Sequence, residues 1–318
     1  MKKQFGLTGE LVISRRHILK AGAVLAGAGL MPAGFRLQAL AAQSLTMGEM
    51  TIHSLSDGNL VLPLAMLAPD TPEAEVKALL EANGLSTTGH EPPCNVTLLE
   101  SGDNKILFDV GSGGNFMPSA GNLLESLDAV SVSPDDITHV VFTHAHPDHL
   151  WGLLDEFDEP IFVNARHMMG EAEHAFWTDP QTADKLPEDR LAFFAGAKRN
   201  LDTLGDAIDL FPAETEVLPG IFAIDTNGHT PGHVSFEIRS GSESVIVSGD
   251  AISHSAISFM HPDWHSGSDQ DREAGAKSRA MLLDRLANEK MMMVGYHLSG
   301  NGIGRAEKDG SAYRFVQA

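Results

Sequence analysis

Short hydrophobic runs alternate along the chain with longer segments in which hydrophobic residues recur every three or four positions. The short runs are rich in Val, Ile and Phe and predict β-strands at residues 96–100, 105–110, 138–143, 160–163, 207–211, 221–225, 234–238, 244–247, 291–294 and 313–316. The longer segments predict helices at residues 72–81, 122–127, 165–177, 188–204 and 271–288. Residues 50–64 are predicted to form a β-hairpin around Asp57-Gly58-Asn59. Because strands alternate with helices and hairpins occur inside each half, the pattern predicts an α/β fold, an αβ/βα four-layer sandwich.

The strand predicted at residues 138–143 leads into four side chains that can bind a metal, namely His144, His146, Asp148 and His149. Alternate side chains of an extended loop share a face, so His144, His146 and Asp148 can converge while His149 points to a neighbouring position. Core packing explains such a cluster poorly, because buried polar groups cost stability unless each finds a partner. The alternative is a solvated loop that happens to be rich in His. We predict a metal site here.

Three further polar motifs lie at the ends of hydrophobic runs or in turns just beyond them. They are Gly-His-Thr-Pro-Gly-His at 228–233, Ser-Gly-Asp at 248–250, and His297 after Val-Gly-Tyr. Such positions suit a site built on a rigid sheet. Two divalent cations, about 3.5–4 Å apart, need more His ligands and a bridging carboxylate than the first cluster supplies. The sequence therefore favours two metal ions, and imidazole and carboxylate ligands suit zinc, manganese, cobalt or iron alike.

Residues 1–41 have the pattern of a twin-arginine export signal. The pair Arg15-Arg16 precedes a Gly/Ala/Leu run at residues 21–30, and Ala39-Leu40-Ala41 supplies a small-residue cleavage site. The apolar run is too short and too Gly-rich to predict a membrane span, although an uncleaved anchor is an alternative. We expect export to the periplasm or the exterior and one domain at residues 42–318, long enough for one large core.

The chain is strongly acidic, with 22 basic and 43 acidic side chains and a formal net charge of −21. Residues 1–41 hold six of the basic and one of the acidic residues, so their removal leaves 16 against 42 and a formal charge of −26. Such a surface repels phosphate backbones and argues against nucleic-acid processing. Cys94, the only cysteine, cannot form an intramolecular disulfide and is predicted to be buried.

The order His-x-His-x-Asp-His, Gly-His-Thr-Pro-Gly-His, Ser-Gly-Asp and a late His resembles the metallo-β-lactamase-fold hydrolases, over about residues 107–315. The resemblance implies the αβ/βα sandwich of that type and one ligand set for each ion. The first ion would be held by His144, His146 and His229, the second by Asp148, His149 and His297, and both would be bridged by Asp250. The resemblance also implies that Asp109 supports the His loop without binding metal, and we interpret His233 as a hydrogen-bonding neighbour of the site.

Other motifs are similar to the exported methyl parathion hydrolase subgroup: Gly113-Gly114-Asn115-Phe116, Phe176-Trp177, Phe193-Phe194 and His297-Leu298-Ser299. Aromatic residues matching Phe116, Trp177 and Phe194 line an apolar pocket in that subgroup, so we predict the same here, with ordinary core aromatics as the alternative. Tyr296 is a candidate to stabilise an oxyanion in the pocket, and the alternative is an ordinary tyrosine in the core or at the rim. Gly300-Asn301 replaces the subgroup's aromatic-Pro pair, which predicts a more open rim.

These features together predict an exported metallohydrolase that cleaves neutral esters with a hydroxide shared by two ions, while Asp148 and Asp250 move protons. Lactones or aryl and alkyl carboxylic esters are the first expected substrates, because an apolar pocket without a cationic clamp favours uncharged molecules. Phosphate triesters are the alternative, and β-lactams are disfavoured because β-lactamases of this fold carry Cys or Ser where Asp250 stands. A di-iron redox enzyme and a silent binding protein are alternatives of other classes. The resemblance also implies a homodimer.

Overall fold

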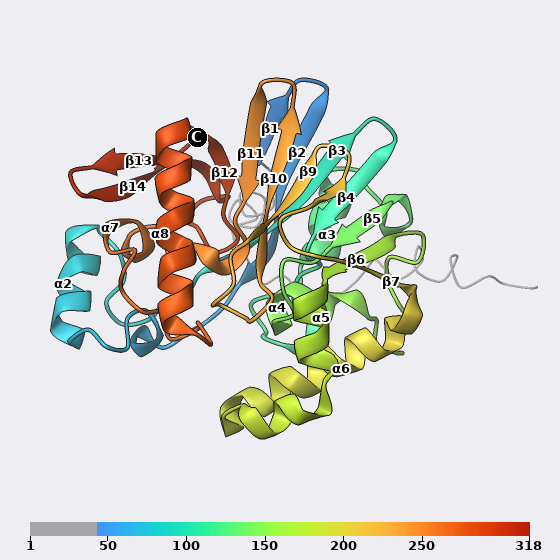
Figure 1. Ribbon diagram of the computed structural model, residues 1–318, viewed down its shortest axis with the longest axis horizontal. Coiled ribbons are helices and arrows are strands. Elements are labelled where there is room, and N and C mark those ends of the chain that lie inside the picture. The colour runs from blue at the N-terminus through green and yellow to red at the C-terminus, as the bar shows by residue number, and fades with distance from the viewer. Residues whose placement is uncertain (1–42) are drawn as a thin grey trace, which may run out of the picture. The chain divides into compact units, whose positions relative to one another are not determined.

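The computed structural model describes residues 43–318, and the export signal predicted for residues 1–41 lies outside the described residues. The strands form two seven-stranded sheets (Figure 1). The first sheet contains, in spatial order, β1 (Gln43–Met47), β2 (Met50–Asn59), β3 (Pro93–Ser101), β4 (Asn104–Phe108), β5 (His139–Val141), β6 (Arg166–Gly170) and β7 (Ile208–Phe211). The second contains β14 (Ala312–Gln317), β13 (Ile303–Asp309), β12 (Met292–Val294), β11 (Glu243–Val247), β10 (Val234–Ser240), β9 (Ile221–Asp225) and β8 (Glu216–Leu218).

The pairing is mixed in both sheets. Strands β4 to β7 run parallel to one another, as do β11 and β12, and the remaining neighbours are antiparallel. The parallel strands need long crossovers, which helices supply. The helices are α2 (Glu73–Ala82), α3 (Leu123–Ala129), α4 (Pro147–Leu150), α5 (Glu171–Thr178), α6 (Leu191–Leu204), α7 (Ile257–Met260) and α8 (Arg272–Glu289). Among the described residues, we find no helix whose length and apolar character would let it cross a membrane.

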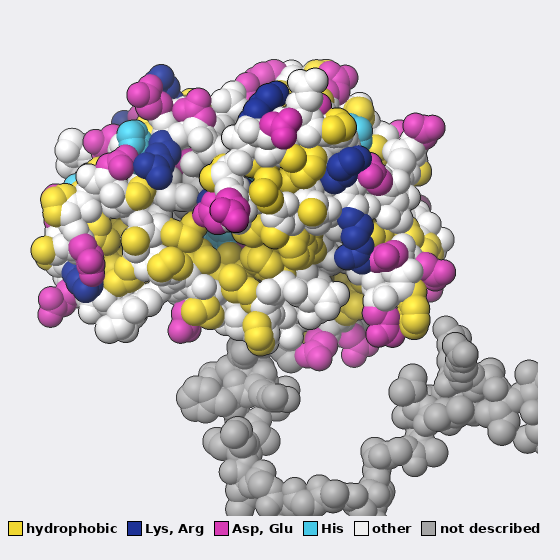
Figure 2. All heavy atoms as spheres, turned by 90° about the horizontal axis from the view of Figure 1, so that it is seen from below, with side chains coloured by type: hydrophobic (Ala, Val, Ile, Leu, Met, Phe, Trp, Pro, Cys, Tyr) yellow, Lys and Arg dark blue, Asp and Glu magenta, His cyan; other side chains and the backbone are white. Residues whose placement is uncertain are grey.

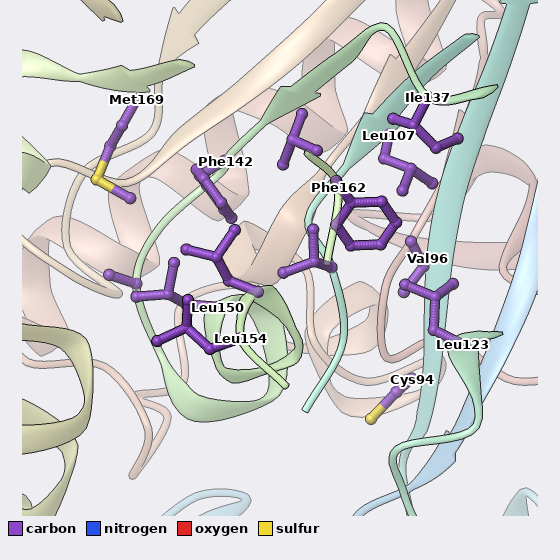
Figure 3. Packing of buried hydrophobic residues seen from close by; sticks show 14 of the residues in the cluster. Cys94, Val96, Leu107, Leu123, Ile137, Phe142, Leu150, Leu154, Phe162 and Met169 are labelled. Atoms are coloured by element: carbon purple, nitrogen blue, oxygen red, sulfur yellow. The ribbon is translucent and has the colours of Figure 1, made fainter. Parts of the chain in front are cut away.

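Three hydrophobic clusters define four layers. The middle cluster joins the two sheets, for example through Phe108 and Phe236, whose ring centroids are 5.2 Å apart. A second cluster packs the outer face of the first sheet against α3, α4, α5 and α6 (Figure 3). A third packs β11 and β12 against α7 and α8. The order helix, sheet, sheet, helix confirms the predicted αβ/βα sandwich, and Cys94 is fully buried in the second cluster as expected.

The prediction of a hairpin at Asp57-Gly58-Asn59 is wrong. β2 runs unbroken through these residues, and the register against β3 shifts between Ser56 and Gly58. Gly58 has a φ of +105°, so the residue pair that suggested a turn instead forms a β-bulge. The real turn lies between β1 and β2.

Two further predictions are wrong in the segment between residues 160 and 177. Residues 160–163 are not a strand; Pro160 makes one isolated bridge to Leu154, and Phe162 fills the core from a loop. Strand β6 occupies the start of the predicted helix at 165–177, which begins only at Glu171. Met168 and Met169 favour helix by propensity, but they pack on opposite faces of the sheet. Their burial on both faces stabilises a strand here in place of the helix.

Candidate metal centre

The predicted ligands lie where strands of both sheets end. His144 and His146 follow β5, and Asp148 and His149 occupy the first turn of α4. His229 lies between β9 and β10, Asp250 follows β11, and His297 follows β12. The two sheets are tied together at this edge because Val234 N donates to the carbonyl of Thr143. Ligands that are far apart in sequence are therefore held on rigid strand ends.

The structure brings all seven side chains together. The closest nitrogen pair is His146 Nδ1 and His229 Nε2, 2.8 Å apart. Asp250 touches both halves of the group: Oδ2 lies 3.2 Å from His229 Nε2 and 3.2 Å from His297 Nε2, and Oδ1 lies 3.2 Å from His149 Nε2. Asp148 Oδ2 lies 3.2 Å from His297 Nε2 and 3.3 Å from His149 Nε2. Asp250 thus lies between the two groups of side chains that the resemblance implies as ligands.

Several atoms of this group are buried without a hydrogen-bond partner, and they share the ability to bind a metal. They are Nε2 of His144, His146 and His149, Oδ2 of Asp148 and Oδ1 of Asp250. An unpaired buried polar atom is costly unless an ion or water satisfies it. The ligand atoms of His144, His146 and His229 lie within 4.8 Å of one another, and so do those of His144, His149 and Asp250. The residues present therefore fit divalent cations.

Charge and burial set the protonation of the ligands. Burial lowers the pKa of His144 and His146 well below the ordinary value, and neighbouring imidazoles add to this effect. Burial opposes ionisation of Asp250, yet the positive charges of His297 and His149 hold its pKa well below the usual range. Carboxylates such as Asp250 in turn raise the pKa of His149 and His297 although burial opposes this, so a bound cation would displace their protons, because neutral imidazole and ionised carboxylate are the forms that bind metals.

Asp109 and His233 contact the ligands without belonging to the group. Asp109 accepts hydrogen bonds from His149 Nδ1, Thr143 N and Thr143 Oγ1, each at 2.8 Å. His233 Nε2 accepts from Asp250 N at 3.0 Å, which leaves its proton on Nδ1, facing Thr226 Oγ1 at 2.9 Å. Burial lowers the pKa of His233 to about 3, so the ring is neutral. Both residues orient a ligand through hydrogen bonds.

Cys94 lies closer to the centre than the sequence suggested. Its thiol falls within 4.8 Å of ligand atoms of Asp148 and His297. Burial raises the pKa of this thiol to about 11.

A cavity of about 300 Å³ opens above the ligands, and His146, His229, Asp250 and His297 form part of its wall. The rest of the wall is mainly apolar and includes Leu60, Leu62, Leu67, Phe116, Met117, Phe193, Ile257 and Trp264. From below, hydrophobic side chains gather across the middle of the molecular surface (Figure 2). Such a cavity suits a small, largely apolar molecule.

Phe116 lines this cavity as predicted, but three other pocket predictions are wrong. Trp177 is fully buried in the core, where its Nε1 donates to Glu173 Oε1 at 2.7 Å. Phe194 packs against the same core and is not part of the cavity wall, whereas its neighbour Phe193 packs against that core and also lines the cavity. Tyr296 is also buried, and its hydroxyl donates to the carbonyl of Asp148 at 2.6 Å, so it is not placed to stabilise an oxyanion.

The cavity also contains polar residues that the sequence did not assign to it. Arg190 and Arg279 line the wall, although the sequence suggested no cation there. His254 lines it too, and its Nδ1 accepts from the backbone N–H groups of Ala256 and Ile257, both at 3.0 Å. The proton of His254 therefore sits on Nε2. Neither Gly300 nor Asn301 is part of this wall, so the predicted effect on the rim is not seen there.

Comparison with known proteins identifies the family. Residues 91–290 match the model of the metallo-beta-lactamase superfamily. The chain belongs to this superfamily.

Relatives within the superfamily include lactone-cleaving enzymes. The uncharacterized protein YobT of Bacillus subtilis is 29% identical over 50% of this chain and 62% of its own length. The N-acyl homoserine lactonase AiiB of Agrobacterium fabrum is 26% identical over 46% of this chain and 58% of its own length. The solved structure of AidC, a dizinc quorum-quenching lactonase, is 27% identical and superposes with a TM-score of 0.81 over 87% of this chain and 97% of that chain. The chain thus shares the superfamily's fold with lactonase-like relatives, and it spans about 60% of the length of the curated relatives named here.

Two buried carboxylates next to the superfamily's histidine motifs were missed from the sequence. Glu173 on α5 accepts hydrogen bonds from Ala145 N and Trp177 Nε1 at one oxygen, and from Thr230 Oγ1 and Gly232 N at the other. Asp269 lies 3.2 Å from His229 Nδ1 and accepts from Arg279 Nη2 at 2.7 Å. In a chain with 43 acidic residues, neither carries a local signal that separates it from surface acids.

Proposed function

We propose that this chain is a dinuclear metal-dependent hydrolase that opens lactones and related neutral carboxylic esters. The observation that carries the proposal is the group of seven buried ligands, several with unpartnered metal-binding atoms, at the wall of an apolar cavity. A silent binding protein has no need to bury so many unpaired polar atoms.

The residues divide into two overlapping ligand groups. We assign one cation to His144, His146 and His229 and the other to Asp148, His149 and His297, with Asp250 shared between them. Two divalent cations, most simply zinc, would polarise the ester carbonyl and lower the pKa of a water.

The protein's own groups supply the rest of the reaction. The carboxylates of Asp148 and Asp250 are the bases nearest to both groups, so they can take a proton from the attacking water and pass it to the departing oxygen. Phe116 and Phe193 hold the apolar part of the substrate and keep bulk water away from the ligands.

A preference for lactones is supported by the relatives. AiiB is an N-acyl homoserine lactonase, and AidC was solved with a product, N-hexanoyl-L-homoserine. A second candidate is phosphate triester hydrolysis of the methyl parathion hydrolase type. It is favoured by the aromatic side chains of Phe116, Phe193 and Trp264 on the cavity wall, which would accept an aryl leaving group.

A substrate screen on protein of known metal content tests the proposal. Metals would be quantified by elemental analysis, and the loaded protein assayed with lactones, aryl esters, thioesters and phosphate triesters. We expect two equivalents of metal and fastest turnover of a lactone or carboxylic ester. Two irons with oxygen consumption and no hydrolysis would instead identify a redox enzyme.

Asp250→Ala tests the shared ligand. We expect this variant to lose bound metal and at least a thousand-fold in kcat, because both groups lose a ligand and the water loses its base. Asp206→Ala, at an exposed position, is the matched control and should keep its bound metal and its kcat. Full metal content with normal turnover in Asp250→Ala would contradict the assignment.

Export through residues 1–41 is part of the proposal and rests on the paired arginines. Replacing Arg15 and Arg16 with Lys should leave the protein in the cytoplasmic fraction, whereas the unmodified chain should reach the periplasm or the medium. The homodimer implied by the resemblance is tested by light scattering on the same preparation.

A further inference from the structure

Arg190 is a cation on the cavity wall. It ends the short 3₁₀ helix Glu188–Arg190 that precedes α6, and it is half-buried. Its Nη2 donates to the carbonyl of Gly267 at 3.2 Å, and its guanidinium carbon lies 5.3 Å from the centroid of the Phe193 ring. In the part of the chain that the structure describes, no carboxylate lies within 4.0 Å of it.

Arg279, on the same wall, is held by an ion pair and two backbone carbonyls, although its Nε has no hydrogen-bond partner. It is almost fully buried, its Nη2 donates to Asp269 at 2.7 Å, and its Nη1 donates to the carbonyls of Pro262 and Trp264. A guanidinium has five N–H donors, and Arg190 uses one of them on Gly267. Arg190, which unlike Arg279 is not held by an ion pair among the described residues, therefore has donors to spare at the cavity wall.

The guanidinium of Arg190 is partly desolvated by its surroundings. Burial lowers the pKa of Arg190, and the carboxylates of Asp189 and Asp269 oppose this only from a distance. The guanidinium stays protonated, since its ordinary pKa is far above neutrality. A partly desolvated cation gains from any oxygen that can accept its free donors.

Arg190 is also close enough to the metal ligands to contact a substrate held by them. Phe193 lies between the two: its ring centroid is 5.3 Å from the guanidinium carbon of Arg190 and 5.7 Å from the imidazole centroid of His146. The guanidinium carbon is therefore at most about 11 Å from that imidazole. A chain of a few atoms beyond the reacting carbonyl spans this gap.

We propose that Arg190 is a specificity-determining residue that donates a hydrogen bond to a carbonyl oxygen on the acyl arm of the substrate. This inference rests on the proposed function and narrows the substrate to esters or lactones that carry a second, uncharged carbonyl. The mainly apolar wall and the chain's formal net charge of −21 disfavour a carboxylate in that place.

Two lactones that differ only at this group make the test. One is N-hexanoyl-homoserine lactone, whose arm carries an amide. The other is α-heptyl-γ-butyrolactone, in which two methylenes replace the amide. A third lactone, with an arm that ends in a carboxylate, tests the preference for an uncharged carbonyl. All are assayed with the metal-loaded full chain, and kcat and KM are determined separately.

We expect Arg190→Met to lower kcat/KM for the amide lactone by roughly 10- to 100-fold, mainly through KM, because a hydrogen bond from a charged donor is lost. For the methylene lactone the same variant should change kcat/KM less than about threefold. Arg190→Lys keeps a charged donor, so its kcat/KM for the amide lactone should lie between the values of the wild type and Arg190→Met. This variant also guards against a folding defect in Arg190→Met. Arg166→Met, an exposed residue on β6, is the control and should leave both substrates unaffected.

Each outcome has a distinct meaning. Equal losses on the amide and methylene lactones, or no loss on either, would overturn the role of Arg190 while leaving the hydrolase intact. Faster turnover of the carboxylate lactone than of the amide lactone would contradict the proposed preference for an uncharged hydrogen-bond acceptor. If the wild-type protein opened none of the lactones, the proposed function would fail first and this inference with it.

Discussion

Asp250 and Glu173 are both buried carboxylates, yet their hydrogen bonds give them different roles. Each oxygen of Glu173 accepts from two donors, so its capacity is filled by the protein. Oδ1 of Asp250 has no hydrogen-bond partner and faces histidine nitrogens. A satisfied carboxylate stabilises the fold, whereas an unsatisfied one among imidazoles is available to a cation.

Glu173→Gln tests the structural role at the residue scale. The new amide NH₂ would face backbone N–H donors, so we expect the free energy of unfolding to fall by about 2–3 kcal/mol, measured by chemical denaturation. Metal affinity should fall too, because Glu173 holds the loop at Ala145 and the turn at Gly232. Glu171→Gln, exposed on the same helix, should change neither. Unaltered stability in Glu173→Gln would show that the network is dispensable.

His167 gives a prediction about pH. It is buried on β6, its Nε2 has no hydrogen-bond partner, and burial lowers its pKa to about 4. The unfolded chain binds a proton near pH 6.5, so this residue's contribution to stability is present above that value and is lost as the pH falls towards 4. Relative to His167→Gln at equal metal loading, the wild type should lose about 2 kcal/mol of stability between pH 7 and pH 5. A constant difference would mean that the pKa of His167 is the same in the folded and the unfolded chain.

At the scale of elements, β2 connects the sheet to the loops beside the metal centre. The bulge at Gly58 leaves no room for a side chain, since an added Cβ would lie 2.1 Å from the carbonyl oxygen of Ser119. Beside it, Asp57 is fully buried and accepts hydrogen bonds from Ser112, Gly121 and Leu123. One strand therefore fixes the loop after β4 and the start of α3.

Asp57→Asn should weaken this connection. An amide nitrogen in place of one carboxylate oxygen cannot accept from the backbone, so we expect stability to fall by about 1–3 kcal/mol in a thermal or urea unfolding experiment. Asp103→Asn, in the exposed turn between β3 and β4, is the matched control and should stay within about 0.5 kcal/mol of wild type. Equal effects of the two changes would show that Asp57 does not hold the loop after β4 and the start of α3 in place.

At the scale of the whole described domain, the ligands come from strand ends of both sheets. His144 follows β5 of the first sheet, whereas Asp250 follows β11 of the second. Because the sheets pack through one shared core, any movement between them separates ligands. Folding and metal binding are therefore thermodynamically coupled.

Removing metal should lower the melting temperature. With metal at about a thousand times its Kd, binding adds about 4 kcal/mol, so a chelator should lower Tm by roughly 10 °C in calorimetry. Added zinc should restore it, and Asp250→Ala should show a much smaller difference. The same Tm with and without chelator would contradict coupling of the ligand group to the fold.

The sequence by itself determined the α/β class and the motifs of ligand-type residues, and the resemblance that these motifs carry implied the layers and the seven residues that meet at the site. These follow from short-range information: hydrophobic periodicity defines strands and helices, and ligand-type residues stand in compact motifs such as residues 144–149. Only the tertiary structure decided the cavity wall. Phe193 and Phe194 are adjacent on α6 and both pack against the core, but Phe193 also lines the cavity and Phe194 does not, a difference that helix packing decides. The hydrogen bonds that Glu173 accepts, and the number of donors that Arg190 leaves unused, likewise depend on residues distant in sequence, such as Gly232 and Gly267. Hydrogen-bond satisfaction is a property of assembled surfaces, which no local pattern of residues encodes.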